Sequence, residues 1–242
     1  MDLFGKIALV TGGARRVGAA ISSALAQAGV DLLIHYNQSA QPVQKLADEI
    51  RRLGRKVQIF QADLASPEQI ESLFDAVGKT VKKLDILVNN AAVYDRTPLD
   101  ELSAAQWDRQ MAVNARAPAL CISRALPLIS DGGAIINITD TSAEKPRSDY
   151  HAYCASKAAL LALTRSSAKA LAGRGIRVNA VAPGVVLWDD SADPRQNEAI
   201  LRQVPLARPA SPQDVAQAVV FLAGSDYITG QCLRVDGGWC MG

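Results

Sequence analysis

Tyr153 and Lys157, two side chains that can take part in proton transfer, lie four residues apart in a segment with helical periodicity. Residues at this spacing share one face of a helix, so we expect the phenol and the ammonium to lie together. A tyrosine with its ordinary pKa of about 10 is a poor acid at neutral pH, but a neighbouring cation favours the phenolate and lowers that pKa. The pair alone is common on protein surfaces, so its meaning depends on the elements that position it.

A glycine-rich loop follows the first apolar run. The segment from Thr11 to Gly18 reads TGGARRVG and lies between a predicted strand and a predicted helix. Glycine lets the backbone approach a diphosphate, and the free N–H groups of the helix start bind its charge. This strand–loop–helix context is typical of a dinucleotide site. Arg16 stands where a third glycine is usual, and its guanidinium suits a phosphate.

Short apolar runs alternate with amphipathic segments along the chain. Predicted strands cover residues 7–11, 32–35, 57–61, 86–89, 134–139, 178–181 and 232–235, and predicted helices cover 17–28, 43–53, 67–81, 104–129, 152–171 and 212–222. This alternation predicts an α/β, single-domain Rossmann fold over residues 1–242, with a doubly wound, parallel, seven-stranded sheet in the order 3-2-1-4-5-6-7 flanked by helices. We expect Pro118 to kink or split its helix, and the polar segment 185–209 to cover the substrate.

The composition argues against several classes of protein. The 242 residues carry a net charge of +2, without the basic excess of a nucleic-acid or membrane-surface binder. The chain has no apolar run of about 18 residues and no signal-peptide pattern at its start, so we expect a cytoplasmic protein. Its cysteines, Cys121, Cys154, Cys232 and Cys240, lack metal-ligand spacing, so we expect no metal site.

The end of the second predicted strand indicates the type of cofactor. NAD sites place a carboxylate there for the ribose 2′-hydroxyl, but this strand ends in HYNQS, residues 35–39, and Asp31 lies at its opposite end. Arg15, Asn37 and Ser39 can donate to a 2′-phosphate. We therefore predict NADPH or NADP as the cofactor, with Asp63 and Leu64 at the end of the third strand holding the adenine.

Together these features resemble the classical short-chain dehydrogenase/reductase family over essentially the whole chain. The motifs that carry the resemblance are Thr11-Gly12 to Gly18, Asp63, Asn89-Asn90-Ala91, Asn114, Tyr153 to Lys157, and Pro183-Gly184. The resemblance implies that Tyr153 donates a proton, that Lys157 binds a ribose and lowers the tyrosine pKa, and that Asn114 belongs to a proton relay. It also implies a homotetramer. The expected cofactor-binding residues are Gly12, Arg15, Arg16, Val17, Tyr36, Asn37, Ser39, Asp63, Leu64, Asn90, Ala91, Lys157, Pro183 and Gly184.

One position departs from the usual family pattern. Asp140 stands thirteen residues before Tyr153, where the family usually has a serine. An ionised carboxylate there would raise the tyrosine pKa, whereas a protonated one can donate. Alternatively, a shift in register gives the serine's role to a neighbour: Thr139, Thr141 or Ser142.

Asp140 and Arg16 together resemble the pteridine reductase branch of the family, as does the stretch HYNQSA at residues 35–40. This resemblance implies NADPH-dependent reduction of a pterin, dihydropterin or related folate. A flat pterin would stack on an aromatic ring such as Tyr94. The expected substrate-binding residues are Arg16, Tyr94, Asp140, Tyr153 and Trp188, although both aromatics could instead be packed or partly exposed loop residues. Two alternatives remain: a carbonyl reductase, such as a 3-oxoacyl-thioester reductase, and a non-catalytic NADPH-binding sensor or scaffold.

We predict that the protein prefers NADPH to NADH, as judged by kcat/KM for each cofactor. Arg15→Ala should weaken NADPH binding by roughly 1.5–3 kcal/mol, because it removes a hydrogen bond between charged groups. NADH binding should change much less, since NADH lacks the 2′-phosphate. Equal kcat/KM values for the two cofactors, or a preference for NADH, would contradict the assignment.

Overall fold

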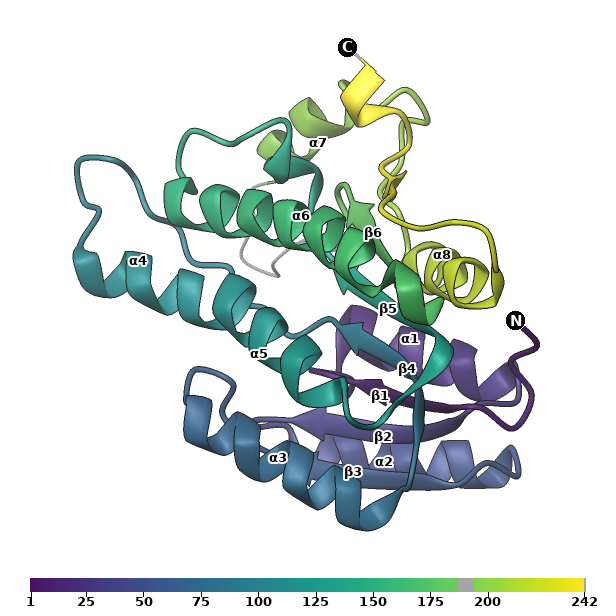
Figure 1. Cartoon of the computed structure of the whole chain (residues 1–242). Coiled ribbons are helices and arrows are strands. Elements are labelled where there is room, and N and C mark those ends of the chain that lie inside the picture. Colours follow the sequence, from purple (N-terminus) through teal and green to yellow (C-terminus); the bar gives the residue numbers. More distant parts are fainter. Residues whose placement is uncertain (187–193, 242) are drawn as a thin grey trace.

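The computed structural model describes residues 1–186 and 194–241. The described chain folds into a three-layer α/β structure with one seven-stranded sheet between helices (Figure 1). Every neighbouring pair of strands is parallel, and their order, β3-β2-β1-β4-β5-β6-β7, is the predicted one. The strands are β1 (Ile7–Val10), β2 (Asp31–Tyr36), β3 (Val57–Gln61), β4 (Leu84–Asn89), β5 (Ile129–Ile138), β6 (Arg177–Pro183) and β7 (Cys232–Val235).

Two apolar clusters bury the two faces of the sheet. One packs α1, α2 and α8 against the strands, and the other packs α3, α5 and α6. Strands β4 and β6 are buried along their whole length, as expected for short, mostly apolar strands in a sheet that is covered on both faces. The helices are α1 (Arg16–Gln27), α2 (Ala40–Arg52), α3 (Pro67–Thr80), α4 (Ala104–Met111), α5 (Ala117–Ala125), α6 (His151–Leu171), α7 (Pro194–Leu201) and α8 (Pro212–Gly224).

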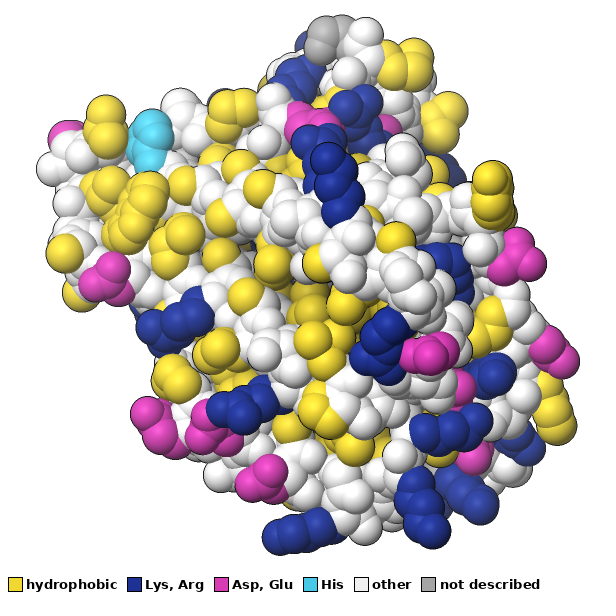
Figure 2. All heavy atoms as spheres, viewed as in Figure 1, with side chains coloured by type: hydrophobic (Ala, Val, Ile, Leu, Met, Phe, Trp, Pro, Cys, Tyr) yellow, Lys and Arg dark blue, Asp and Glu magenta, His cyan; other side chains and the backbone are white. Residues whose placement is uncertain are grey.

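The surface of the molecule is mixed in character. On the face shown in Figure 2, hydrophobic side chains gather around α4, α5 and α6, whereas Lys and Arg are spread over the rest of the surface. Within residues 1–186 and 194–241, no helix is both long and apolar enough to cross a membrane. The same residues contain no metal-binding group of three or more His, Cys, Asp or Glu side chains.

The predicted helix over residues 104–129 is wrong in its extent. It is interrupted by a π-helix, Ala112–Arg116, between α4 and α5, and it stops at Ala125, so that β5 begins at residue 129. Pro118 lies in the first turn of α5 and has no N–H to donate to the carbonyl of Asn114, four residues earlier. A wider turn at this point carries Asn114 into the interior, where it is fully buried.

The glycine loop turns sharply at the carboxyl edge of the sheet. A Cβ on Gly18 would lie 2.1 Å from the carbonyl oxygen of Gly12, and one on Gly12 would lie 2.9 Å from the Cα of Ala91. Both positions therefore exclude a side chain. Arg16 has a φ of 49°, in the left-handed region, which disfavours a residue with a Cβ by roughly 1–2 kcal/mol.

His35 ties this loop to the neighbouring strands. The N–H of Gly12 donates to its Nδ1 at 3.1 Å, and its Nε2 lies 3.0 Å from the carbonyl oxygen of Ala62. Because Nδ1 accepts, the proton of the neutral ring is on Nε2 and is donated to Ala62. Burial lowers the pKa of His35 below its ordinary value of 6.5. The bridge therefore needs the neutral imidazole.

This bridge predicts a pH-dependent stability. Below pH about 6.5 the unfolded chain binds a proton at His35 more readily than the folded chain. The free energy of unfolding should therefore fall as the pH drops from about 6.5 toward the lowered pKa of the folded state. Thermal unfolding between pH about 5 and 7 measures the effect, and His35→Gln should flatten it, whereas His151→Gln, which replaces the other histidine, should preserve it. An unchanged slope in His35→Gln would refute the role of the bridge.

Candidate active site

A cavity of about 860 Å³ lies at the carboxyl edge of the sheet, within the size range of small-molecule sites. Its walls come from the glycine loop, the loop after β4, the turn after β5, the start of α6 and the residues after β6. The sequence-predicted residues that line it are Gly12, Arg15, Arg16, Val17, Asn90, Ala91, Tyr94, Asp140, Tyr153, Lys157, Pro183 and Gly184.

Asp140 faces Tyr153 directly. The Tyr153 hydroxyl donates to Oδ2 of Asp140 at 2.9 Å, and the backbone N–H of Ser142 donates to Oδ1 at 2.7 Å. The hydroxyl of Thr139 instead donates to the carbonyl of Val181. Asp140 therefore occupies the position that faces Tyr153, and the alternative that Thr139, Thr141 or Ser142 occupies it does not apply.

The electrostatics of this pair differ from the expectation. Burial raises the pKa of Tyr153 well above 10, and the carboxylate of Asp140 raises it further. Lys157 lies with its Nζ 5.6 Å from the Tyr153 ring centroid and donates to the carbonyl of Ile138 at 2.8 Å. Burial lowers the pKa of Lys157 to about 8, although Asp140 opposes that shift. The pKa of Tyr153 thus shifts upward, opposite to the lowering expected from Lys157, because burial and the Asp140 carboxylate both raise it.

Three tyrosines form one wall of the cavity. Tyr94 stacks on Tyr150 with ring centroids 4.4 Å apart, and it meets Tyr153 in an edge arrangement at 4.6 Å. Nη1 of Arg147 donates to the Tyr94 hydroxyl at 2.8 Å. Tyr94 remains 48% exposed, so a flat substrate could stack only on the ring face that Tyr150 leaves free.

The residues around the glycine loop fit a dinucleotide diphosphate. The Asn90 side-chain amide donates to the carbonyls of Thr11 and Gly12 at 2.9 and 3.0 Å, which holds the loop in place. Helix α1 has no acidic residue in its first turn and no side-chain cap at Arg15. Its first N–H groups are thus available to an anion.

The residues expected around the adenine ribose lie along the same edge but outside the lining of this cavity. Tyr36 ends β2, Asn37 is exposed, and Ser39 precedes α2 without capping it. Asp63 accepts from the N–H of Ala65 at 2.9 Å. The side chain of Leu64 is buried in the apolar core, so only its backbone could reach a ligand. Asp31 binds the N–H of Lys56 at the far end of its strand, as predicted.

The side-chain hydrogen bonds of Asn114 go to residues other than Tyr153 and Lys157. Its side-chain amide donates to the carbonyl of Val93 at 2.9 Å and to the Ser156 hydroxyl at 3.0 Å, and its Oδ1 accepts from the N–H of Val93 at 2.9 Å. These contacts hold the loop that carries Tyr94. A relay role for Asn114 stays a prediction. Trp188 lies outside the described residues.

Three further groups lining the cavity were not anticipated from the sequence: Tyr150, Arg147, and the ion pair of Arg96 with Asp149. Tyr150 lies just before α6 with a non-helical backbone, so helical spacing from Tyr153 gave no signal for it. Arg147 lies in a loop whose path carries no periodic pattern, so its sequence position gave no such signal.

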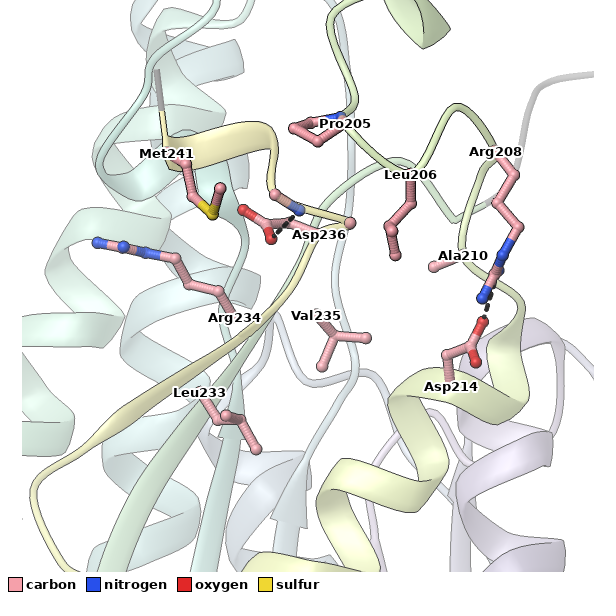
Figure 3. Close-up of a pocket in the computed structure, with 12 residues that line it drawn as sticks. Pro205, Leu206, Arg208, Ala210, Asp214, Leu233, Arg234, Val235, Asp236 and Met241 are labelled. Carbon is pink, nitrogen blue, oxygen red and sulfur yellow. Dashed lines mark hydrogen bonds and ion pairs between the residues drawn. The ribbon is translucent and has the colours of Figure 1, made fainter.

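The segment after β7 holds the loop between Asp140 and α6. Nζ of Lys145 donates to the carbonyl of Trp239 at 3.0 Å and lies 5.2 Å from its ring centroid, and Arg234 pairs with Glu144. Beside this contact a second cavity, of about 540 Å³, is lined by residues of the segment and by residues between 205 and 210 (Figure 3). None of the sequence-predicted site residues that the structure describes lines that second cavity.

The chain is similar to known proteins over nearly its whole length. The family model described as enoyl-(acyl carrier protein) reductase matches residues 12–240. The 3-oxoacyl-[acyl-carrier-protein] reductase FabG of Staphylococcus aureus (strain Mu50 / ATCC 700699) is 36% identical over 242 residues, which is 98% of each chain. The short-chain dehydrogenase/reductase FrzI of Cladobotryum sp is 37% identical over 249 residues, covering 98% of this chain and 96% of that protein.

Solved structures agree with the fold. The angucycline C-6 ketoreductase LanV with bound NADP has a TM-score of 0.94 and 35% identity, covering 100% of this chain and 98% of that one. A blue fluorescent protein from a metagenomic library, in complex with NADPH, has a TM-score of 0.94 and 38% identity, covering 99% and 100%.

A Rossmann sheet with a tyrosine–lysine pair beside the glycine loop defines a nucleotide-dependent oxidoreductase. The chain belongs to the short-chain dehydrogenase/reductase family. The names of these relatives agree with the carbonyl-reductase alternative and do not support the pteridine reductase branch.

We predict that Tyr153→Phe lowers kcat by about 10²- to 10⁴-fold, because it removes a proton donor while the ring still packs against Tyr94. Cofactor affinity, measured by fluorescence titration, should stay close to that of the wild type. Tyr150→Phe is the matched control, since it deletes the same atom three residues earlier, and it should retain most of the turnover. Wild-type turnover in Tyr153→Phe would remove this residue from the mechanism.

Proposed function

We propose that the protein is an NADPH-dependent reductase of a pterin or dihydropterin, in which the Asp140–Tyr153 pair supplies the proton. The proposal rests chiefly on the 2.9 Å hydrogen bond between the Tyr153 hydroxyl and Oδ2 of Asp140. A carboxylate repels the lone pairs of a ketone oxygen, but it accepts hydrogen bonds from the N–H groups on the edge of a pterin. The acid therefore suits a nitrogen-rich ring better than a simple carbonyl.

The protonation state of the pair follows from its electrostatics. If Tyr153 gave up its proton beside an ionised Asp140, two negative charges would face each other across one hydrogen bond. A protonated Asp140 avoids this, because its proton can replace the one that Tyr153 donates to a substrate nitrogen. The pair then begins with two protons and ends with one.

Other side chains would orient the two ligands. NADPH, when bound, supplies the hydride. The glycine loop, Arg15 and the first turn of α1 would hold its phosphates, and Lys157, buried with its Nζ on the carbonyl of Ile138, would bind a ribose. Arg16 and the free face of Tyr94 line the same cavity and would hold the pterin.

A second candidate is reduction of a 3-oxoacyl thioester. It is favoured by the FabG relative, which shares 36% identity across 98% of both chains. In this reaction Tyr153 would protonate the developing alkoxide. Asp140 and Arg16 weigh against this candidate, because a thioester substrate would need neither side chain, and the serine usual in the family is missing.

The assembly and location remain proposals. We infer a homotetramer from family resemblance, and the apolar surface around α4, α5 and α6, where Trp107 is 38% exposed, supports contacts with other copies (Figure 2). A cytoplasmic location and a single domain over residues 1–242 belong to the same proposal. A pure sensor or scaffold would have no need of a buried tyrosine and lysine beside a half-buried aspartate in one cavity.

Asp140→Ser separates the two substrate classes. With a dihydropterin, kcat/KM should fall by about 10²-fold or more, because the acid that handles a ring nitrogen is lost. With an acetoacetyl thioester, the same variant should be unchanged or faster, since the serine hydroxyl can donate to the carbonyl. NADPH oxidation by both proteins with both substrates provides the measurement.

Arg16→Gly is a second test of the same assignment. It should raise the KM for the pterin while relieving the left-handed strain at this position, with a smaller effect on cofactor binding. Unchanged pterin turnover in Asp140→Ser, or a wild type that reduces the thioester far better than any pterin, would overturn the pterin proposal and leave the carbonyl reductase.

A further inference from the structure

Arg147, in the loop before α6, is a cation whose hydrogen-bonding partner is neutral. Its Nη1 donates to the Tyr94 hydroxyl at 2.8 Å, and it lines the main cavity. Burial raises the pKa of Tyr94 well above its ordinary value, so this phenol stays protonated. The hydrogen bond therefore orients the guanidinium without neutralising its charge.

The acidic side chains of the cavity are already engaged elsewhere. Asp149 accepts both Nε and Nη2 of Arg96, at 3.3 and 3.0 Å, and Asp140 accepts from Tyr153 and from the backbone of Ser142. Among the described residues, no carboxylate lies within ion-pair distance of Arg147. A half-buried arginine of this kind has free N–H donors that suit a planar or tetrahedral oxyanion.

Arg147 is connected through Tyr94 to Tyr153, the proposed proton donor. Tyr94 links the two, since its hydroxyl contacts Arg147 and its ring meets Tyr153 at 4.6 Å. The positive charge of Arg147 acts on Tyr153, where it lowers the pKa against the larger upward effect of burial. A substrate that reacts at Tyr153 and extends over Tyr94 would bring its far end to Arg147.

We propose that Arg147 binds an anionic group on the substrate, so that the preferred substrates are anions with the reducible bond at one end and a carboxylate or phosphate at the other. This inference rests on the proposed reductase activity and names the substrate class. Two sources share the chemistry: the glutamate carboxylates of a reduced folate and the phosphate of a pantetheine thioester. Arg147 thus acts as a specificity-determining residue.

The test compares substrates in matched pairs that differ in the anion. One pair is dihydrofolate and the neutral dihydrobiopterin, and the other is acetoacetyl-pantetheine 4′-phosphate and acetoacetyl-pantetheine. In Arg147→Gln, kcat/KM for the anionic member of the productive pair should fall by about 10- to 100-fold relative to the neutral one. Arg147→Lys should recover part of this preference, because it keeps the positive charge but lacks the paired N–H donors of the guanidinium.

The matched control is the double variant Arg96→Gln with Asp149→Asn, which removes an arginine from the same cavity without changing its net charge. It should keep the wild-type preference for the anion. An equal loss for both members of a pair in Arg147→Gln would overturn the proposal, since Arg147 would then serve only to hold Tyr94. An unchanged ratio would overturn it as well.

Calorimetry measures the binding of the anion by itself, so that the anion site can be tested independently of the proposed reaction. Dihydrofolate and the pantetheine phosphate are titrated into the wild type and Arg147→Gln, each loaded with NADPH. Absence of turnover with all four substrates would refute the proposed reductions, yet weaker binding of an anion to Arg147→Gln would still support the anion site. Equal affinity of both proteins for each anion would refute that site.

Discussion

Strands β1 and β4 lie side by side and parallel, but the chain leaves their carboxyl ends in opposite directions across the sheet. After β1 it turns toward β2 and β3, and after β4 it turns toward β5 and β6. The two connections diverge, so a crevice must open between them. The Asn90 amide spans this divide by bonding the carbonyls of Thr11 and Gly12. The cavity, the glycine loop and the wall formed by Tyr94, Tyr150 and Tyr153 all depend on this arrangement.

Within that crevice the chemistry is governed by the cost of burying charge. Tyr153 and Lys157 are buried beside the half-buried Asp140, whose carboxylate raises the pKa of both. With a serine in place of Asp140, the site would hold the Tyr153 phenol and the Lys157 ammonium with no carboxylate beside them. The acid therefore gives this member of the family a different set of accessible protonation states on an unchanged scaffold. A conserved fold can in this way carry different chemistry through one side chain.

The sequence predicted the fold well because its signals are local and repeated. Apolar runs located all seven strands, and the serine–proline pairs at Ser66 and Ser211 marked two helix starts, where both serines do cap the helix. The helix over 104–129 was drawn too long because apolar residues beyond Ala125 continue a helical pattern that tertiary packing overrides. The sequence predicted site residues only where they belong to a recognisable motif. Contacts between residues that are distant in sequence, such as Arg147 with Tyr94 and His35 with Ala62, produce no periodic pattern from which they could be predicted.

The contact between Lys145 and Trp239 joins residues 94 positions apart, and Arg234 reaches back 90 positions to Glu144. The loop that follows Asp140 is therefore synthesised long before the segment that fixes it. During translation the strands β1 to β6 can assemble while this loop is still without its outer support. The loop between Asp140 and α6 can therefore gain these contacts only after β7 and the segment behind it have been synthesised and have docked.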